Sequence, residues 1–202
     1  MNWSFFRAIA GYLLKGRFAF PGGHLPSSGH LVPENFAGVG VAASVDPAVD
    51  DWIIDNLSAA GIRNVRLDFT YGDAEGPAGR LLRRLIDADF RIVLHLLQPA
   101  DAACQMPAPE AGETWRQFVV DTLDGFGKSV AMIEVCSTIN RKRWAGYSIE
   151  GFLSAWEIAW REVRARGLLL AGPSITDFEP PWNVGVLSLL RERGLLPDIN
   201  TD

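Results

Sequence analysis

The chain has 202 residues, of which 48% are hydrophobic and 21% are charged, a balance that is ordinary for a globular protein with a sizeable core. Its formal net charge of -5 argues against a nucleic-acid partner, because binding to phosphates normally requires a basic face. The two cysteines, Cys104 and Cys136, are too few for a disulfide framework, and no Cys/His spacing is typical of a metal site. We therefore expect no metal, no cofactor and a reducing, cytoplasmic compartment.

Residues 1–20 have the spacing of an amphipathic helix, with apolar side chains from Trp3 to Leu14 and three basic residues, Arg7, Lys15 and Arg17. No apolar stretch approaches the ~20 residues that a membrane span requires. Two interpretations remain open. In the first, the helix lies on an anionic membrane surface, which would make the protein peripheral to the inner membrane. In the second, which is the commoner case, the segment packs on the rest of the domain or is a floppy tail.

Residues 21–34 are rich in Gly, Pro and Ser and are typical of a linker. From residue 35 to 202, apolar strand patterns alternate with helical patterns. The predicted strands are 36–43, 62–70, 90–97, 130–136 and 168–171, with the start of a sixth at 195–200. The predicted helices are 46–60, 77–88, 113–126, 149–166 and 184–193, with a long loop at 98–112.

This alternation predicts an α/β fold with parallel strands and right-handed crossovers. The first strand, expected to be buried, lacks the glycine fingerprint of a dinucleotide fold, which favours a (β/α)8 TIM barrel over an open doubly wound sheet. A complete barrel takes about 250 residues, whereas residues 35–202 supply five to six units. The prediction is a partial barrel that is truncated at its C-terminal side. Its open edge would favour self-association.

Polar side chains follow the predicted strands, where the ligands of such folds bind. The candidates are Ser44, Asp68, Tyr71, His95, Gln98, Glu134, Thr138, Asn140, Asp177 and Glu179, with Trp144, Tyr147 and Trp182 in the adjoining loops. Carboxylates and amides can bind sugar hydroxyls, while flat aromatic rings stack on the apolar faces of sugar rings. The pattern predicts a carbohydrate site, although the aromatic residues could instead seal the loop.

The charged candidates also have structural interpretations. Glu134 and Arg66, on facing positions of neighbouring strands, would make a structural ion pair. His95 would be a core histidine on an apolar strand. Asp177 and Glu179 would cap the helix that follows them.

The segments EVCSTINRKRWAGYS, LAGPSITDFEPPWN and GLLPDINTD, with Arg66 on the second strand and His95 on the third, carry a resemblance that extends from Phe36 to the last residue. The chain resembles the clan of retaining barrel glycosidases. More narrowly, it is similar to predicted glycosyl hydrolases encoded with bacterial lipopolysaccharide core genes. That clan has the segment E-x-x-N-E-P at its fourth strand. Here Ser137 occupies the asparagine position and Thr138 occupies the acid/base position.

The resemblance implies a glycoside hydrolase-like protein that acts on O-glycosidic bonds of a bacterial surface glycan, with an oligosaccharide or glycolipid as its partner. A threonine cannot protonate a leaving group at neutral pH, so the alternative is a non-catalytic carbohydrate-binding or scaffold protein. If chemistry is retained, we expect Glu134 to act as acid or base, tuned by Arg66, with Asp68 or Glu179 as the second carboxylate. The expected substrate-binding residues are His95, Thr138, Asn140, Trp144, Tyr147, Asp177 and Trp182.

Overall fold

The computed structural model describes residues 3–19, 38–177 and 179–201. Its centre is a parallel sheet of five strands whose order in space is their order along the chain. The strands are β1 (Gly38–Val41), β2 (Asn64–Phe69), β3 (Arg91–Leu96), β4 (Met132–Val135) and β5 (Leu170–Ala171). Because the order never reverses, the sheet has no doubly wound switch point, and the arrangement is that of a partial (β/α) barrel.

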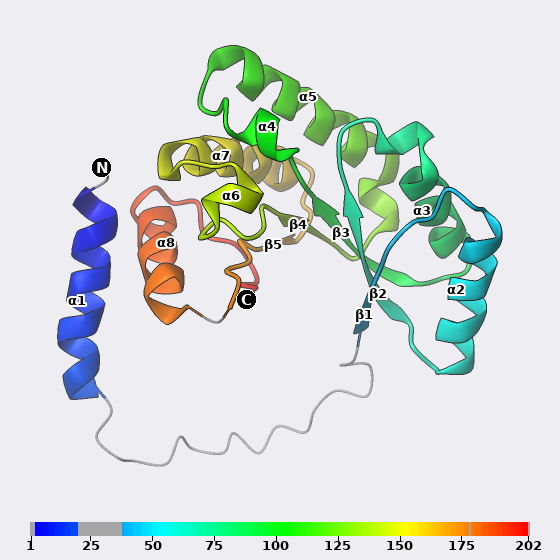
Figure 1. The fold of residues 1–202 in the computed structure, drawn as a ribbon, viewed down its shortest axis with the longest axis horizontal. Helices are drawn as coiled ribbons and strands as arrows, with labels where there is room; N and C mark the ends of the chain where they lie inside the picture. Colours follow the sequence, from blue (N-terminus) through cyan, green and yellow to red (C-terminus); the bar gives the residue numbers. More distant parts are fainter. Residues whose placement is uncertain (1–2, 20–37, 178, 202) are drawn as a thin grey trace.

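The helices that follow the strands are wound around the outer face of this curved sheet (Figure 1). They are α2 (Ala48–Ala59), α3 (Pro77–Asp87), α5 (Pro109–Phe126), α7 (Ile149–Ala165) and α8 (Pro180–Glu192). Shorter helices are η1 (Asp73–Glu75), α4 (Ala100–Ala103), η2 (Gly127–Ser129) and α6 (Lys142–Ala145). The prediction of a long loop over residues 98–112 is wrong in part, since this segment contains α4 and the first turn of α5. Both α5 and α8 begin earlier than expected, each at a proline, which needs no N–H partner in the first turn.

The core lies between the sheet and its helices. Along β2 the outward side chains Val65, Leu67 and Phe69 are buried, while the alternate positions face the barrel interior. Trp115 of α5 and Trp156 of α7 are fully buried, and each indole N–H finds a backbone acceptor at 2.8 Å. Satisfying these donors lets two large rings fill the core without an unpaired polar group.

The first strand departs from expectation. β1 was predicted to be buried, but its residues are mostly exposed, with Val39 at 38% exposure. The physical reason is that β1 pairs only with β2 in the described part of the chain, so one of its edges is uncovered. The expected sixth strand is reduced to a single parallel bridge between Ala171 and Ile199. Self-association through the uncovered edge stays a prediction.

The N-terminal helix α1 (Trp3–Ala19) lies beside α8, at the edge of the molecule (Figure 1). Phe5 is 3% exposed and its ring centroid lies 4.9 Å from that of Trp182 on α8. One side of α1 therefore packs on the rest of the domain, through α8. The predicted linker 21–34 lies outside the described residues. Among the described helices, none combines the length and the apolar character needed to cross a membrane.

Candidate functional site

A polar cavity of about 290 Å³ opens at the carboxyl ends of β2, β3 and β4. It is lined by Arg66, Asp68, His95, Leu97, Gln98, Cys136, Ser137, Thr138, Trp144, Ala145 and Tyr147. The register of the sheet creates this grouping, because Asp68 lies beside His95 and His95 lies beside Glu134 on consecutive parallel strands. Six of the eleven side chains predicted for the site thus line one cavity, and Glu134 lies directly behind it.

Arg66 is the centre of a charged network on the inner face of the sheet. Its Nε donates to Oε2 of Glu134 at 2.5 Å, and its NH1 group donates to Oδ1 of Asp68 at 2.9 Å. Its NH2 group lies 2.6 Å from Nδ1 of His95. One guanidinium therefore contacts all three titratable neighbours, two of which are carboxylates of opposite charge to it.

The two carboxylates differ in their access to a ligand. Only 4% of the Glu134 side chain is exposed, and its second oxygen accepts a hydrogen bond from the Thr201 hydroxyl at 3.1 Å. Asp68 has 58% of its side chain exposed and lies on the wall of the cavity. Glu134 therefore has the surroundings of a structural ion pair, one of the two interpretations that the sequence left open, whereas Asp68 can meet a bound molecule.

The Asp68 carboxyl is held in its ionised form. The hydrogen bond from His95 lowers the pKa of Asp68 below its ordinary value of 3.8, and the positive charge of Arg66 adds to this effect against the opposing effect of partial burial. A carboxylate with a lowered pKa accepts hydrogen bonds at neutral pH but has no proton to give.

His95 is 1% exposed, as expected for a core histidine. Its Nδ1 lies 2.8 Å from Asp68 Oδ1, and its Nε2 is buried without a hydrogen-bond partner among the described residues. Since Arg66 has donors only, Nδ1 either accepts from Arg66 or donates to Asp68, depending on the tautomer. In both cases the ring is part of the cavity wall and orients its charged neighbours.

A row of hydroxyl groups forms another wall. The Ser137 and Thr138 hydroxyls lie 3.0 Å apart, and the Thr176 hydroxyl donates to Thr138 Oγ1 at 3.1 Å. Cys136 and Thr138 both adopt positive φ, at 58° and 59°, a conformation that costs energy for residues other than glycine. The strain is held by backbone hydrogen bonds between this loop and Ser174. The loop after β4 is thus fixed in an unusual shape that turns hydroxyls toward the cavity.

Tyr147 connects the floor of the cavity to the loop after β2. Its hydroxyl donates to Gln98 Oε1 at 2.7 Å, and Gln98 in turn donates to the Tyr71 hydroxyl at 2.9 Å. Burial raises the pKa of Tyr147 well above its ordinary value and raises that of the neighbouring Cys136 thiol to about 12. Both groups therefore stay neutral. By contrast, Trp144 has 68% of its surface exposed at the cavity mouth.

The remaining predicted residues lie elsewhere. Asn140 donates to Glu179 at 3.0 Å, and Arg141 bridges Glu179 and Asp177 at 2.7 Å each. These bonds lower the pKa of Glu179, the bond from Asn140 being the larger cause. This second cluster touches the cavity wall through Thr176, whose backbone N–H donates to Asn140. Glu179 is the residue that precedes α8, but its side chain makes no capping bond to that helix.

Trp182 is not among the residues that line this cavity and packs against Phe5 of α1, so its role in substrate binding stays a prediction. Sequence reasoning also missed three side chains that complete the network, namely Ser137 and Cys136 on the cavity wall and Thr201 behind it. Thr201 follows the bridge residue Ile199 by two positions, so alternation along the expected sixth strand could have placed it on the inner face. In the part of the chain that the structure describes, no cluster of three His, Cys, Asp or Glu side chains could hold a metal ion.

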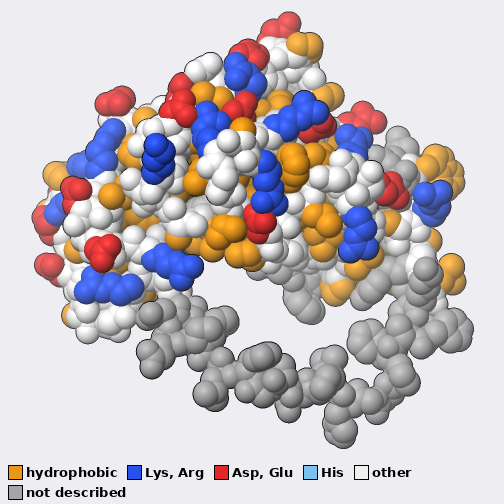
Figure 2. Space-filling view, turned by 180° about the vertical axis from the view of Figure 1, so that it is seen from behind, with side chains coloured by type: hydrophobic (Ala, Val, Ile, Leu, Met, Phe, Trp, Pro, Cys, Tyr) orange, Lys and Arg blue, Asp and Glu red, His pale blue; other side chains and the backbone are white. Residues whose placement is uncertain are grey.

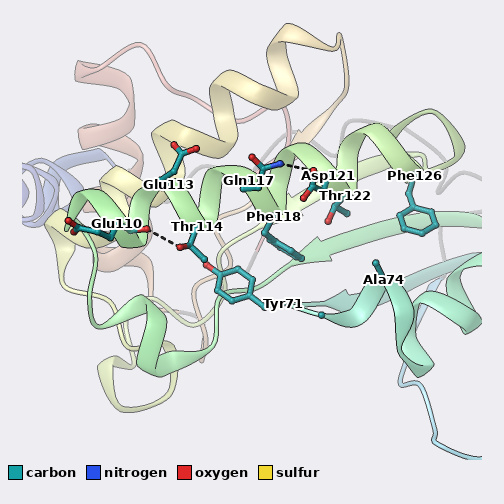
Figure 3. Close-up of a pocket in the computed structure, with 11 residues that line it drawn as sticks. Tyr71, Ala74, Glu110, Glu113, Thr114, Gln117, Phe118, Asp121, Thr122 and Phe126 are labelled. Carbon is teal, nitrogen blue, oxygen red and sulfur yellow. Dashed lines mark hydrogen bonds between the residues drawn. The ribbon is translucent and has the colours of Figure 1, made fainter.

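A larger hollow of about 860 Å³ lies outside the strand ends, between α5 and the loop after β2 (Figure 3). Its wall is aromatic, with Tyr71, Phe118 and Phe126, and Glu110 and Asp121 lie on its rim. It offers apolar area but few convergent polar groups. The polar cavity is therefore the better candidate for specific recognition.

The sequence matches no protein-family model and no curated protein. Among solved structures, the chain is similar to one described as the structure of L-ribulose 3-epimerase, with 16% sequence identity and a TM-score of 0.43. The match covers 66% of this chain and 48% of that one, so the chain spans about half the length of the protein that it resembles.

Proposed function

We propose that the polar cavity binds a sugar ring of a bacterial surface glycan, and that the protein is a carbohydrate-binding member of the barrel fold without hydrolytic activity. The observation that carries the proposal is the composition of the wall. An ionised carboxylate, an amide and hydroxyls converge on one cavity, and Trp144 is exposed at its mouth. A volume of about 290 Å³ is close to the lower limit of about 300 Å³ for ligand pockets, which suits a single ring.

The carboxyl groups argue for binding rather than cleavage. Retaining hydrolysis uses two carboxyls about 5–5.5 Å apart, one of which must carry a proton for the leaving group. Asp68 and Glu179 both have lowered pKa values, and Glu134 is enclosed by Arg66 and Thr201. At the acid/base position Thr138 supplies a hydroxyl, which is neutral at physiological pH.

Hydrolysis of O-glycosidic bonds is the second candidate, and the exposure of Asp68 favours it. An accessible ionised carboxylate can act as a nucleophile or as a general base if the substrate itself or water supplies the proton. The resemblance of the strand-end segments to glycosidases encoded with lipopolysaccharide core genes suggests the same glycan class for both candidates.

The test is calorimetric titration of the protein with oligosaccharides released from bacterial lipopolysaccharide by mild acid. We expect binding that Asp68→Asn weakens and that Trp144→Ala weakens by about tenfold, since stacking and buried aromatic area contribute about 1–2 kcal/mol. Trp52→Ala is the matched control. Trp52 is 65% exposed, nearly the same as Trp144, but it lies on α2 away from the cavity.

Equal affinities for Trp144→Ala and the wild type would contradict a ring stacked at the cavity mouth. A parallel assay for released reducing ends distinguishes the two candidates. Turnover by the wild type that Asp68→Asn abolishes would establish the hydrolase and refute the proposal of a binder.

A further inference from the structure

The N-terminal helix has two apolar faces, and only one of them is used in the fold. Phe5 and Ile9 face α8, where Phe5 is buried. Next to this face, further around the helix, lie Trp3, Phe6 and Leu13, at 76%, 45% and 55% exposure, with spacings of three and seven residues. Leu14 is 69% exposed and lies on the same face as Trp3, because the eleven positions between them make about three turns of a helix. We call Trp3, Phe6, Leu13 and Leu14 the outer stripe of α1.

The outer stripe is a concentration of exposed apolar surface. Apolar side chains are visible along the right-hand edge of the molecule seen from behind, where α1 lies (Figure 2). Trp3, Phe6 and Leu13 border a shallow hollow of about 740 Å³, in which Arg7 is the cation. Isolated exposed apolar residues are ordinary on a protein surface, but an aligned set on one helix marks a binding face.

The net charge of the N-terminal segment indicates which kind of partner the outer stripe binds. Residues 1–33 contain Arg7, Lys15 and Arg17 and no acidic residue, whereas the whole chain has 24 acidic against 19 basic residues. The segment that carries the outer stripe is thus net positive because it lacks acidic residues, in a chain that is net negative overall. A helix with Trp, Phe and Leu on one face and flanking Arg and Lys is the composition that lies in the interface of a bilayer with anionic lipids.

We propose that α1 attaches the protein to an anionic membrane surface, with the outer stripe inserted between the lipid headgroups and the Phe5 face holding the domain to the helix. Trp3 is suited to this depth, because an indole ring is apolar while its N–H remains in contact with water or headgroups. The carbohydrate cavity is independent of this proposal, since none of its lining residues belongs to α1 or α8.

The experiment is co-sedimentation of the full chain with vesicles of phosphatidylcholine alone or of phosphatidylcholine with phosphatidylglycerol. We expect binding to the anionic vesicles, weak binding to the neutral ones, and a loss of binding as salt is raised. The double variant Leu13→Glu/Leu14→Glu should weaken binding by at least about tenfold, because two side chains no longer enter the apolar layer. Arg7→Gln and Arg17→Gln should each weaken it by about fivefold.

The control is Val45→Glu/Leu169→Glu, which adds the same charge at two exposed apolar positions outside α1 and should bind as the wild type does. Equal loss in both double variants would overturn the proposal, since it would show an effect of net charge alone. Failure of the wild type to bind anionic vesicles would overturn it as well. Sedimentation velocity without lipid tests the alternative that the outer stripe binds a second copy of the chain. If the wild type is a dimer and Leu13→Glu/Leu14→Glu converts it to monomers, the outer stripe is a dimer interface and the proposal of membrane attachment is refuted.

Discussion

The contact between Arg66 and Glu134 gives a prediction whose size follows from burial. Arg66→Met removes the guanidinium and keeps a side chain of comparable length, so Glu134 remains 4% exposed without its cation. Removing one partner of a buried ion pair costs about 3–5 kcal/mol. Because 37% of the Arg66 side chain is exposed, water can partly replace it, and we expect the lower end of this range, about 3 kcal/mol.

Urea unfolding followed by circular dichroism measures this loss. With a slope of about 2 kcal/mol per molar urea for a chain of this size, the midpoint should fall by about 1.5 M. Glu134→Gln should cost less, about 1 kcal/mol, because Arg66 keeps its contact with Asp68 and its access to water. The double variant Arg66→Met/Glu134→Gln leaves no buried charge at either position. It should be more stable than the sum of the single effects predicts, by about 1–2 kcal/mol.

Strict additivity of the two single changes would refute this reasoning, because it would mean that the two side chains do not interact. A negligible effect of Arg66→Met would refute the burial of Glu134 itself. Both outcomes would remove the charged network from the account of the cavity.

Three further outcomes are expected. Gly185→Val should release α1 from α8, since a Cβ at Gly185 would lie 2.6 Å from the Phe5 ring; faster hydrogen exchange across residues 3–19 measures the release. Of the two cysteines, exposed Cys104 should react with a thiol reagent at pH 8, whereas Cys136, with a pKa raised to about 12, should react only on unfolding, as mass spectrometry of labelled peptides would show. Because the pKa of Asp68 is lowered in the folded state, its ionised form stabilises the fold above its ordinary pKa of 3.8, and this stability is lost as the pH falls through the folded pKa. A gap in stability between the wild type and Asp68→Asn that does not narrow as the pH is lowered below 3.8 would contradict this.

The repeating pattern of the chain was enough to predict the parallel strands and their helices. Short apolar runs ending in turn residues mark β2 and β3, and glycines with positive φ at positions 61 and 167 follow α2 and α7. These features depend on contacts within about ten residues, so they are visible in the sequence. Alternation on β2 and β4 also put Arg66 and Glu134 on the inner face, and the structure has them there in contact.

The tertiary structure alone decided what those residues do. Exposure of β1 depends on which neighbour covers its edge, and enclosure of Glu134 depends on Thr201, which is 67 residues away along the chain. The position of Trp182 against Phe5 likewise joins segments from opposite ends of the sequence. Local pattern fixes which face of a strand or helix a side chain occupies. Burial, pairing and pKa are set by distant segments that fold onto that face, and no spacing rule in one sequence records which segments these are.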